Sequence, residues 1–129
     1  MKKSIFLLLV FFSLTGCQTA PAAEPITTIY LIRHAEKDRS EGVGENPELT
    51  ETGHARAQGW ARVFREEPLD AVYSTQYKRT EQTATPTAQF YGLEVMSYEP
   101  YDIDPVEFIE KHKGQNVLIV GHSNTTPML

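Results

Sequence analysis

The chain has 129 residues, about one domain's length, with 40% hydrophobic and 22% charged residues, which is typical of a globular protein and not of a disordered or fibrous one. Its 12 basic and 17 acidic residues give a net charge of −5, which argues against general nucleic-acid binding because that function needs a basic surface. The one cysteine excludes a disulfide or a cysteine-built zinc site within these residues.

The first residues have the pattern of a targeting segment. Two lysines precede a nearly unbroken apolar run, residues 5–14, which is half the length of about twenty residues that a membrane-spanning helix needs. The LTGC motif at residues 14–17 resembles the bacterial lipoprotein signal, which is cut before the cysteine and acylated on it. This resemblance implies a lipoprotein signal peptide over residues 1–16 and a lipid-anchored membrane attachment through Cys17. A plain secretory signal with an incidental cysteine is the alternative.

Gln18 and the residues around it bear on where the mature chain resides. An aspartate after the cysteine would indicate inner-membrane retention, so Gln18 favours the bacterial cell envelope at the periplasmic face of the outer membrane. Small, polar residues and prolines predict a tether over residues 17–25. The folded domain is predicted over residues 26–129. Because too few residues follow His122 to complete a helix, we expect this domain to be truncated at the C-terminus.

Predicted strands and helices alternate along the domain. Apolar, β-branched segments predict strands over residues 26–32, 71–73, 93–96 and 116–120. Capping residues predict one helix that begins at Glu51 after Thr50 and another that begins at Pro105 after Asp104. A third helix is predicted over residues 78–91, with an interruption at Pro86 and an end at Gly92. Polar residues 37–48 are predicted to form a surface loop. This order predicts an α/β fold, a mostly parallel sheet flanked by helices.

Basic and imidazole side chains follow three of the predicted strands. Arg33 and His34 follow the first strand, Arg79 lies at the start of the helix after the second, and His122 follows the last. Ligands of α/β sheets bind at the carboxyl ends of the strands. If these strands are neighbours, two arginines and two histidines meet at one edge of an acidic protein, which predicts a site for a phosphoryl group.

These residue types suit phosphoryl transfer. A neutral imidazole can attack phosphorus and hold the phosphoryl group covalently, provided that its other nitrogen donates a proton, for example to a backbone carbonyl. Adjacent arginines would lower the pKa of that histidine by like-charge repulsion. Guanidinium groups and a second histidine would stabilise the transferred phosphoryl oxygens, and a carboxylic acid would protonate the leaving oxygen.

Four motifs occur in an order that resembles a known family. The LIRHAE segment at residues 31–36 is similar to the Arg-His-Gly signature of the histidine phosphatase superfamily, which has the phosphoglycerate mutase-like fold. Three further matching segments are LTETG at residues 49–53, YST at 73–75 with RTEQTA at 79–84, and VLIVGHS at 117–123. Ala35 stands where the signature usually has glycine, as in compact members of the phosphohistidine phosphatase-like branch.

The resemblance implies a hydrolase, a histidine phosphatase that hydrolyses phosphate monoesters or phosphoramidates through a phosphohistidine on His34. Arg33, Arg79 and His122 would be catalytic and would bind the phosphoryl group of the substrate. No metal and no organic cofactor is expected, and the partner would be a small phosphorylated substrate or a phosphohistidine protein. The proton donor stays open between Glu99 and Asp102.

Two other functions compete with this interpretation. A non-catalytic, anion-binding lipoprotein would keep the same phosphate pocket without turnover. A serine hydrolase would use Ser123, because residues 121–125 resemble the G-x-S-x-G nucleophile elbow. However, Thr125 replaces the last glycine, and the triad acid and histidine would have to follow Ser123 in the chain.

Overall fold

The structure is a computed structural model that describes residues 22–126. The predicted signal peptide and Cys17 lie outside the described residues. The elements, in chain order, are β1 (Thr28–Arg33), α1 (Glu51–Val63), a 3-10 turn (Phe64–Glu66), β2 (Ala71–Ser74), α2 (Lys78–Tyr91), β3 (Val95–Ser97), α3 (Pro105–Lys111) and β4 (Asn116–Gly121). None of the helices within residues 22–126 is long and apolar enough to cross a membrane.

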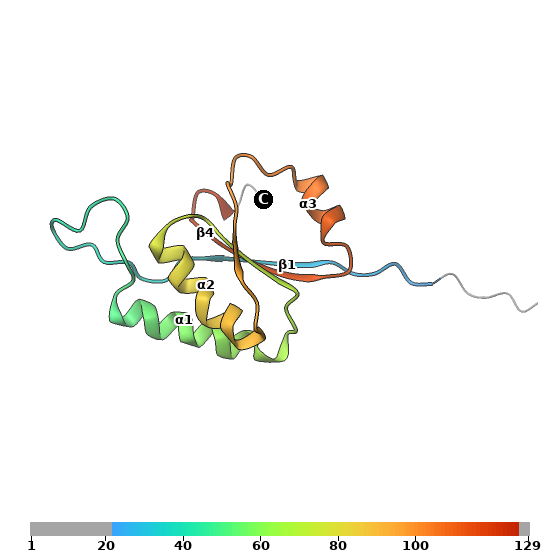
Figure 1. The fold of residues 1–129 in the computed structure, drawn as a ribbon, viewed down its shortest axis with the longest axis horizontal. Helices are drawn as coiled ribbons and strands as arrows, with labels where there is room; N and C mark the ends of the chain where they lie inside the picture. The colour runs from blue at the N-terminus through green and yellow to red at the C-terminus, as the bar shows by residue number, and fades with distance from the viewer. Residues whose placement is uncertain (1–21, 127–129) are drawn as a thin grey trace, which may run out of the picture.

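The four strands form one parallel sheet in the order β1-β4-β2-β3. Helices α1 and α2 lie together on one face of this sheet, and α3 lies on the other face (Figure 1). The predicted α/β class with a mostly parallel sheet flanked by helices is therefore confirmed.

The central strand β4 is buried on both faces, as its unbroken apolar sequence predicts. Successive side chains of a strand point to opposite faces of the sheet. Leu118 and Val120 accordingly join the core that α1 and α2 cover, whereas Val117 and Ile119 join the core on the face of α3. Because β4 is anchored from both sides, the residues that follow it start from a fixed point.

The predicted helix starts are confirmed by their caps. The Thr50 hydroxyl accepts a hydrogen bond from the backbone N–H of Gly53 at 3.1 Å, and the Asp104 carboxylate accepts two from the first turn of α3. The predicted interruption at Pro86 is wrong, because α2 continues through this residue to Gly92, which ends it with φ of +65°. Buried side chains before and after Pro86 hold both halves of α2 against the sheet and α1, so packing outweighs the local cost of the proline.

The first strand begins two residues later than predicted. Thr28 pairs with Asn116, the first residue of β4, so the residues before Thr28 have no strand beside them. Ile26 is accordingly 82% exposed. At the other end of the sheet, Arg33 pairs with Gly121 and Ser74 with Val120, so β1, β4 and β2 end side by side.

Candidate active site

The ends of β1 and β4 bring two histidines together. His34 follows Arg33 and His122 follows Gly121, and these preceding residues are partners in the sheet. The two imidazole rings have their centroids 5.4 Å apart, at an interplanar angle of 65°. The juxtaposition predicted from the strand order is therefore present.

The two rings lie in a cleft of about 700 Å³. Arg33 and Arg79 line this cleft with them, so the structure brings all four predicted site residues to one place. The cleft is also lined by residues that the sequence analysis did not assign, including Lys37, Arg39, Thr75, Tyr77 and Tyr101. Lys37, Arg39 and Tyr101 lie in or beside the loops that cross the edge of the sheet, where sequence patterns give little signal.

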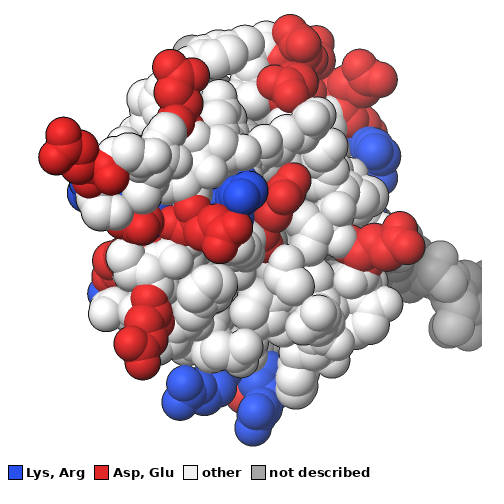
Figure 2. All heavy atoms as spheres, turned by 60° about the vertical axis from the view of Figure 1, so that its left-hand side comes forward, with Lys and Arg blue, Asp and Glu red and all other residues white. Residues whose placement is uncertain are grey.

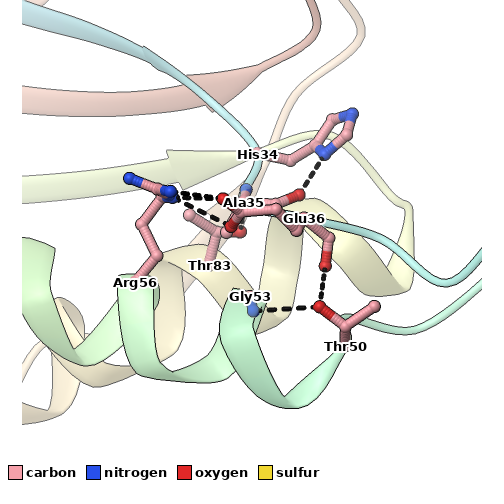
Figure 3. Close-up of polar contacts among 7 residues, drawn as sticks. All are labelled: His34, Ala35, Glu36, Thr50, Gly53, Arg56 and Thr83. Carbon is pink, nitrogen blue, oxygen red and sulfur yellow. Dashed lines mark hydrogen bonds and ion pairs between the residues drawn. The ribbon is translucent and has the colours of Figure 1, made fainter.

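His34 is held in one tautomer by its neighbour. Its Nδ1 lies 2.7 Å from the backbone carbonyl oxygen of Ala35, which can only accept, so Nδ1 carries the proton and Nε2 has a free lone pair (Figure 3). Burial lowers the pKa of His34, and the positive charges of Arg79, Arg33 and Lys37 lower it further, against the opposing effect of the Ala35 hydrogen bond. The ring is therefore neutral at pH 7.

Ala35 fixes the backbone beneath this ring. Its N–H donates to the hydroxyl of Thr83 on α2 at 2.9 Å (Figure 3), and its methyl group is buried with Leu49 and Ala57. The alanine at the position where the family signature has glycine therefore fills a small core between the β1 end and α1. The backbone of residues 34 and 35 is thus held by the sheet, through the His34 N–H, and by α2, through the Ala35 N–H.

Glu36 joins the same backbone to α1. The guanidinium of Arg56 forms an ion pair with the Glu36 carboxylate, and the Glu36 carbonyl accepts from the N–H and the hydroxyl of Thr50 at 2.8 and 3.2 Å (Figure 3). Gly53 lies against that carbonyl so closely that a Cβ atom there would be 2.2 Å from the oxygen. The threonine and the glycine of the LTETG motif are thus needed to dock α1 beside the site.

His122 is positioned by the residue that follows β2 and by its own turn. Its ring Nε2 lies 3.0 Å from the hydroxyl of Thr75, and its backbone N–H donates to the hydroxyl of Thr125 at 3.1 Å. Burial, first of all, and then the charge of Arg79 and the neighbouring His34 together lower the pKa of His122 to about 4. His122 is thus a second neutral imidazole in the cleft.

Arg79 is a buried cation that has no ion-pair partner and two open hydrogen-bond donors within the described residues. It is 9% exposed, and neither Nε nor Nη1 has a hydrogen-bond partner there. Its guanidinium lies over the ring of Tyr77, with Cζ 4.3 Å from the ring centroid, which fixes its plane. Buried polar groups are almost always hydrogen-bonded, so two open donors beside two imidazoles indicate a site for an anion.

The structure separates the two candidate proton donors. Glu99 lines the cleft, whereas Asp102 lines a different depression, beside Phe108 of α3. Ser123 also lines the cleft, but no histidine nitrogen within residues 22–126 lies at hydrogen-bonding distance from its hydroxyl. The described part of the chain holds no group of three or more metal-ligating side chains.

Known proteins share this sequence pattern and this fold. The pattern of the histidine phosphatase superfamily (branch 1) matches residues 29–100. Phosphoserine phosphatase 1 of Hydrogenobacter thermophilus is 37% identical over an alignment of 73 residues, which covers 53% of this chain and 34% of that protein. The chain thus spans about a third of the length of this curated relative.

Two solved structures show the likeness in three dimensions. One is the putative phosphohistidine phosphatase SixA from Agrobacterium tumefaciens, with a TM-score of 0.59 and 24% identity over 76% of this chain and 70% of that one. The other is a phosphoserine phosphatase from Entamoeba histolytica, with a TM-score of 0.61 and 16% identity over 75% of this chain and 74% of that one. Both share the fold.

Proposed function

Because this chain belongs to the histidine phosphatase superfamily, we propose that it hydrolyses phosphate monoesters or phosphoramidates through a phosphohistidine on His34. The observation that carries the proposal is the pair of neutral imidazoles, 5.4 Å apart, beside the unpartnered donors of Arg79 in one cleft. The proposed substrate is a small phosphorylated molecule or a phosphohistidine protein.

The phosphoryl group binds between the guanidiniums of Arg33 and Arg79 and the ring of His122. Arg79 offers the two donors that lack partners, and its fixed plane suits two phosphoryl oxygens at once. These groups stabilise the negative charge that spreads over the oxygens in the transition state.

His34 then attacks with the lone pair of Nε2. The N–P bond forms as the bond from phosphorus to the leaving atom breaks, and the ring becomes positively charged. The Ala35 carbonyl oxygen, which accepts a hydrogen bond from Nδ1–H with the nitrogen and the oxygen 2.7 Å apart, stabilises that positive charge. Water then attacks the phosphohistidine, the N–P bond breaks, and inorganic phosphate leaves.

Glu99 is the proposed proton donor, since it lines the cleft and Asp102 does not. As an acid it gives its proton to the leaving atom, and as a carboxylate it takes a proton from the attacking water. Glu99→Gln is expected to lower kcat on alkyl phosphates about 100-fold, whereas Asp102→Asn leaves it unchanged. The reverse order of effects would assign the role to Asp102.

Turnover of p-nitrophenyl phosphate by the full chain tests the proposed activity. His34→Ala is expected to abolish it, and His54→Ala, at an exposed histidine outside the cleft, is the matched control. Phosphate binding without turnover would instead favour the anion-binding lipoprotein. Labelling of Ser123 by a fluorophosphonate, with turnover lost in Ser123→Ala, would favour the serine hydrolase.

We also propose that Cys17 carries a lipid anchor in the bacterial cell envelope. Support comes from the LTGC motif and the apolar run before it. Radiolabelled palmitate is expected to be incorporated into the expressed chain and not into Cys17→Ser. Equal labelling of both would refute the anchor without affecting the proposed chemistry.

A further inference from the structure

A chain of two hydroxyl groups leads from α2 to His122. The Thr80 hydroxyl lies 2.9 Å from the Thr75 hydroxyl, which in turn lies 3.0 Å from Nε2 of His122. Thr80 is 0% exposed and Thr75 is 2% exposed. Because both are buried, each of their protons must be shared with a neighbouring group of the protein.

The direction of this chain is fixed at its Thr80 end. The Thr80 hydroxyl lies 2.8 Å from the carbonyl oxygen of Tyr77 and 2.9 Å from the carbonyl oxygen of Thr75. Carbonyl oxygens can only accept, so contacts of this length require that the Thr80 proton points toward them. The Thr80 hydroxyl oxygen therefore accepts a hydrogen bond from the Thr75 hydroxyl.

The proton of the His122 ring follows from one proton per hydroxyl. Since Thr75 donates to Thr80, its oxygen can only accept from His122, and Nε2 of His122 must carry the proton. His34 is held the other way, with its proton on Nδ1 beside the Ala35 carbonyl. The two imidazoles, 5.4 Å apart, are thus held as opposite tautomers.

The second nitrogen of His122, Nδ1, is open to the cleft. It forms no hydrogen bond within residues 22–126, and it is not enclosed, because the enclosed side-chain atoms without partners there belong to Arg79, Thr87 and Tyr98. The His122 ring lines the cleft. In the neutral ring Nδ1 holds a lone pair, which repels a phosphoryl oxygen, so Nδ1 can donate to an anion only after a proton has been added to it.

The surroundings of His122 keep its ring neutral before an anion binds. The molecule is acidic, with carboxylates spread over the face shown in Figure 2 and a net charge of −5. Around His122 the cations prevail, and the charged and titratable groups are Arg33, His34, Lys37, Tyr77, Arg79 and Glu99. Burial and the cations among these groups lower the pKa of His122, and a bound dianion would act in the opposite direction.

We propose that Thr75 and Thr80 are positioning residues that hold His122 with its proton on Nε2, so that binding of a phosphoryl dianion adds a proton from solvent to Nδ1. The new Nδ1–H donates to an oxygen of the anion while Nε2–H still donates to Thr75, and release of phosphate returns the proton to solvent. This inference rests on the proposed phosphatase function and adds what sets the proton state of its second imidazole. Both threonines act through His122.

Nuclear magnetic resonance of the full chain with ¹⁵N-labelled histidine reads both tautomers. Cross peaks between the ring nitrogens and the ring C–H protons distinguish the two forms, and His34→Ala and His122→Ala assign the signals. At pH 7 we expect His34 in the Nδ1–H form and His122 in the Nε2–H form. A His122 ring with its proton on Nδ1 would overturn the proposal.

Removing the far hydroxyl tests the chain itself. In Thr80→Val, Thr75 loses its acceptor and turns its proton toward His122, so the ring should change to the Nδ1–H form, whereas Thr75→Ser should keep the Nε2–H form. Thr87→Val, at another buried threonine of α2, is the matched control and should leave the ring unchanged, because the Thr87 hydroxyl has no partner among the described residues. An Nε2–H ring in a folded Thr80→Val would overturn the role of the chain. If circular dichroism shows that Thr80→Val is unfolded, Thr75→Val decides instead, and a ring that stays entirely in the Nε2–H form there has the same meaning.

The affinity for inorganic sulfate measures the proton uptake. Sulfate is a tetrahedral dianion that carries no proton near neutral pH, so a proton taken up on binding goes to the protein. Between about pH 8 and pH 6.5, where His34 stays neutral, calorimetry should show an affinity that rises about threefold or more as the pH falls, with about tenfold per pH unit as the limit for one proton. In Thr80→Val the affinity should change less than about twofold, because Nδ1 already carries a proton. An affinity of the full chain that does not depend on pH would overturn the proton uptake.

Failure of the proposed function would look different. Turnover of p-nitrophenyl phosphate that is unaffected by His34→Ala would refute the phosphatase, whatever the tautomers are. The Nδ1–H form of His122 in a chain whose turnover depends on His34 would refute only the positioning role of the two threonines.

Discussion

Gly53 is the position at which one added methyl group should damage both stability and activity. It lies in the first turn of α1, where a Cβ atom would be 2.2 Å from the carbonyl oxygen of Glu36 and 3.1 Å from the Cβ of Leu49. An ordinary contact needs about 3.4 Å or more, so the backbone must move by about an ångström, because the obstructing atom is backbone and cannot rotate away. Gly53→Ala is expected to cost about 2–3 kcal/mol, the typical penalty of overpacking.

Gly59 supplies the matched control in the same helix. A Cβ atom there meets nothing within 4 Å, so Gly59→Ala should stabilise the chain by about 0.5–1 kcal/mol through helix propensity alone. Urea unfolding followed by circular dichroism measures both changes. The shift at Gly53 should also lower kcat about 10- to 100-fold, since the displaced carbonyl is next to the residue that holds His34. Equal stability of the two variants would refute the reasoning.

Three further expectations follow from the charged and titratable groups of the cleft. Arg79→Met should lower kcat/KM about 100- to 1000-fold, because it removes a charge that would bind the phosphoryl group. It should nevertheless raise the melting temperature, because Arg79 is a buried cation whose Nε and Nη1 lack hydrogen-bond partners among the described residues. A lower melting temperature would show that Arg79 is structural. The loss of kcat/KM on acidification should begin below pH 6.5, since the pKa of His34 is lowered and only the neutral ring attacks. For His122, whose pKa falls from 6.5 when unfolded to about 4 when folded, the unfolded chain binds more protons between these values. Its contribution to stability is thus present above pH 6.5 and lost as the pH falls toward 4, so unfolding of His122→Gln should depend less on pH in this window.

The sequence predicted the parts of the site that directly follow strands. Arg33, His34 and His122 could be placed because parallel strands end at a common edge, and their neighbours in the chain match a family signature. Arg79 could be placed because it lies at the start of the helix that follows β2. These positions depend on where the strands end, and the apolar segments that form the strands are easily recognised in the sequence.

Contacts between distant segments could not be predicted in the same way. The choice of Glu99 over Asp102 depends on how the loop after β3 folds, and no local pattern determines that path. The position of Lys37 in the cleft depends on its pairing with Leu49, 12 residues further along the chain. The continuity of α2 through Pro86 likewise depends on packing against α1, which a local propensity does not contain.

The central claim is that His34 carries the phosphoryl group during turnover, and trapping that group tests it most directly. The full chain is mixed with a ³²P-labelled phosphate ester, quenched within milliseconds in alkali, digested and analysed by mass spectrometry. A phosphate that is stable in alkali, labile in acid and located on His34 is the result we expect. A phosphate on another residue, or rapid turnover with no labelled protein at any time, would contradict the account.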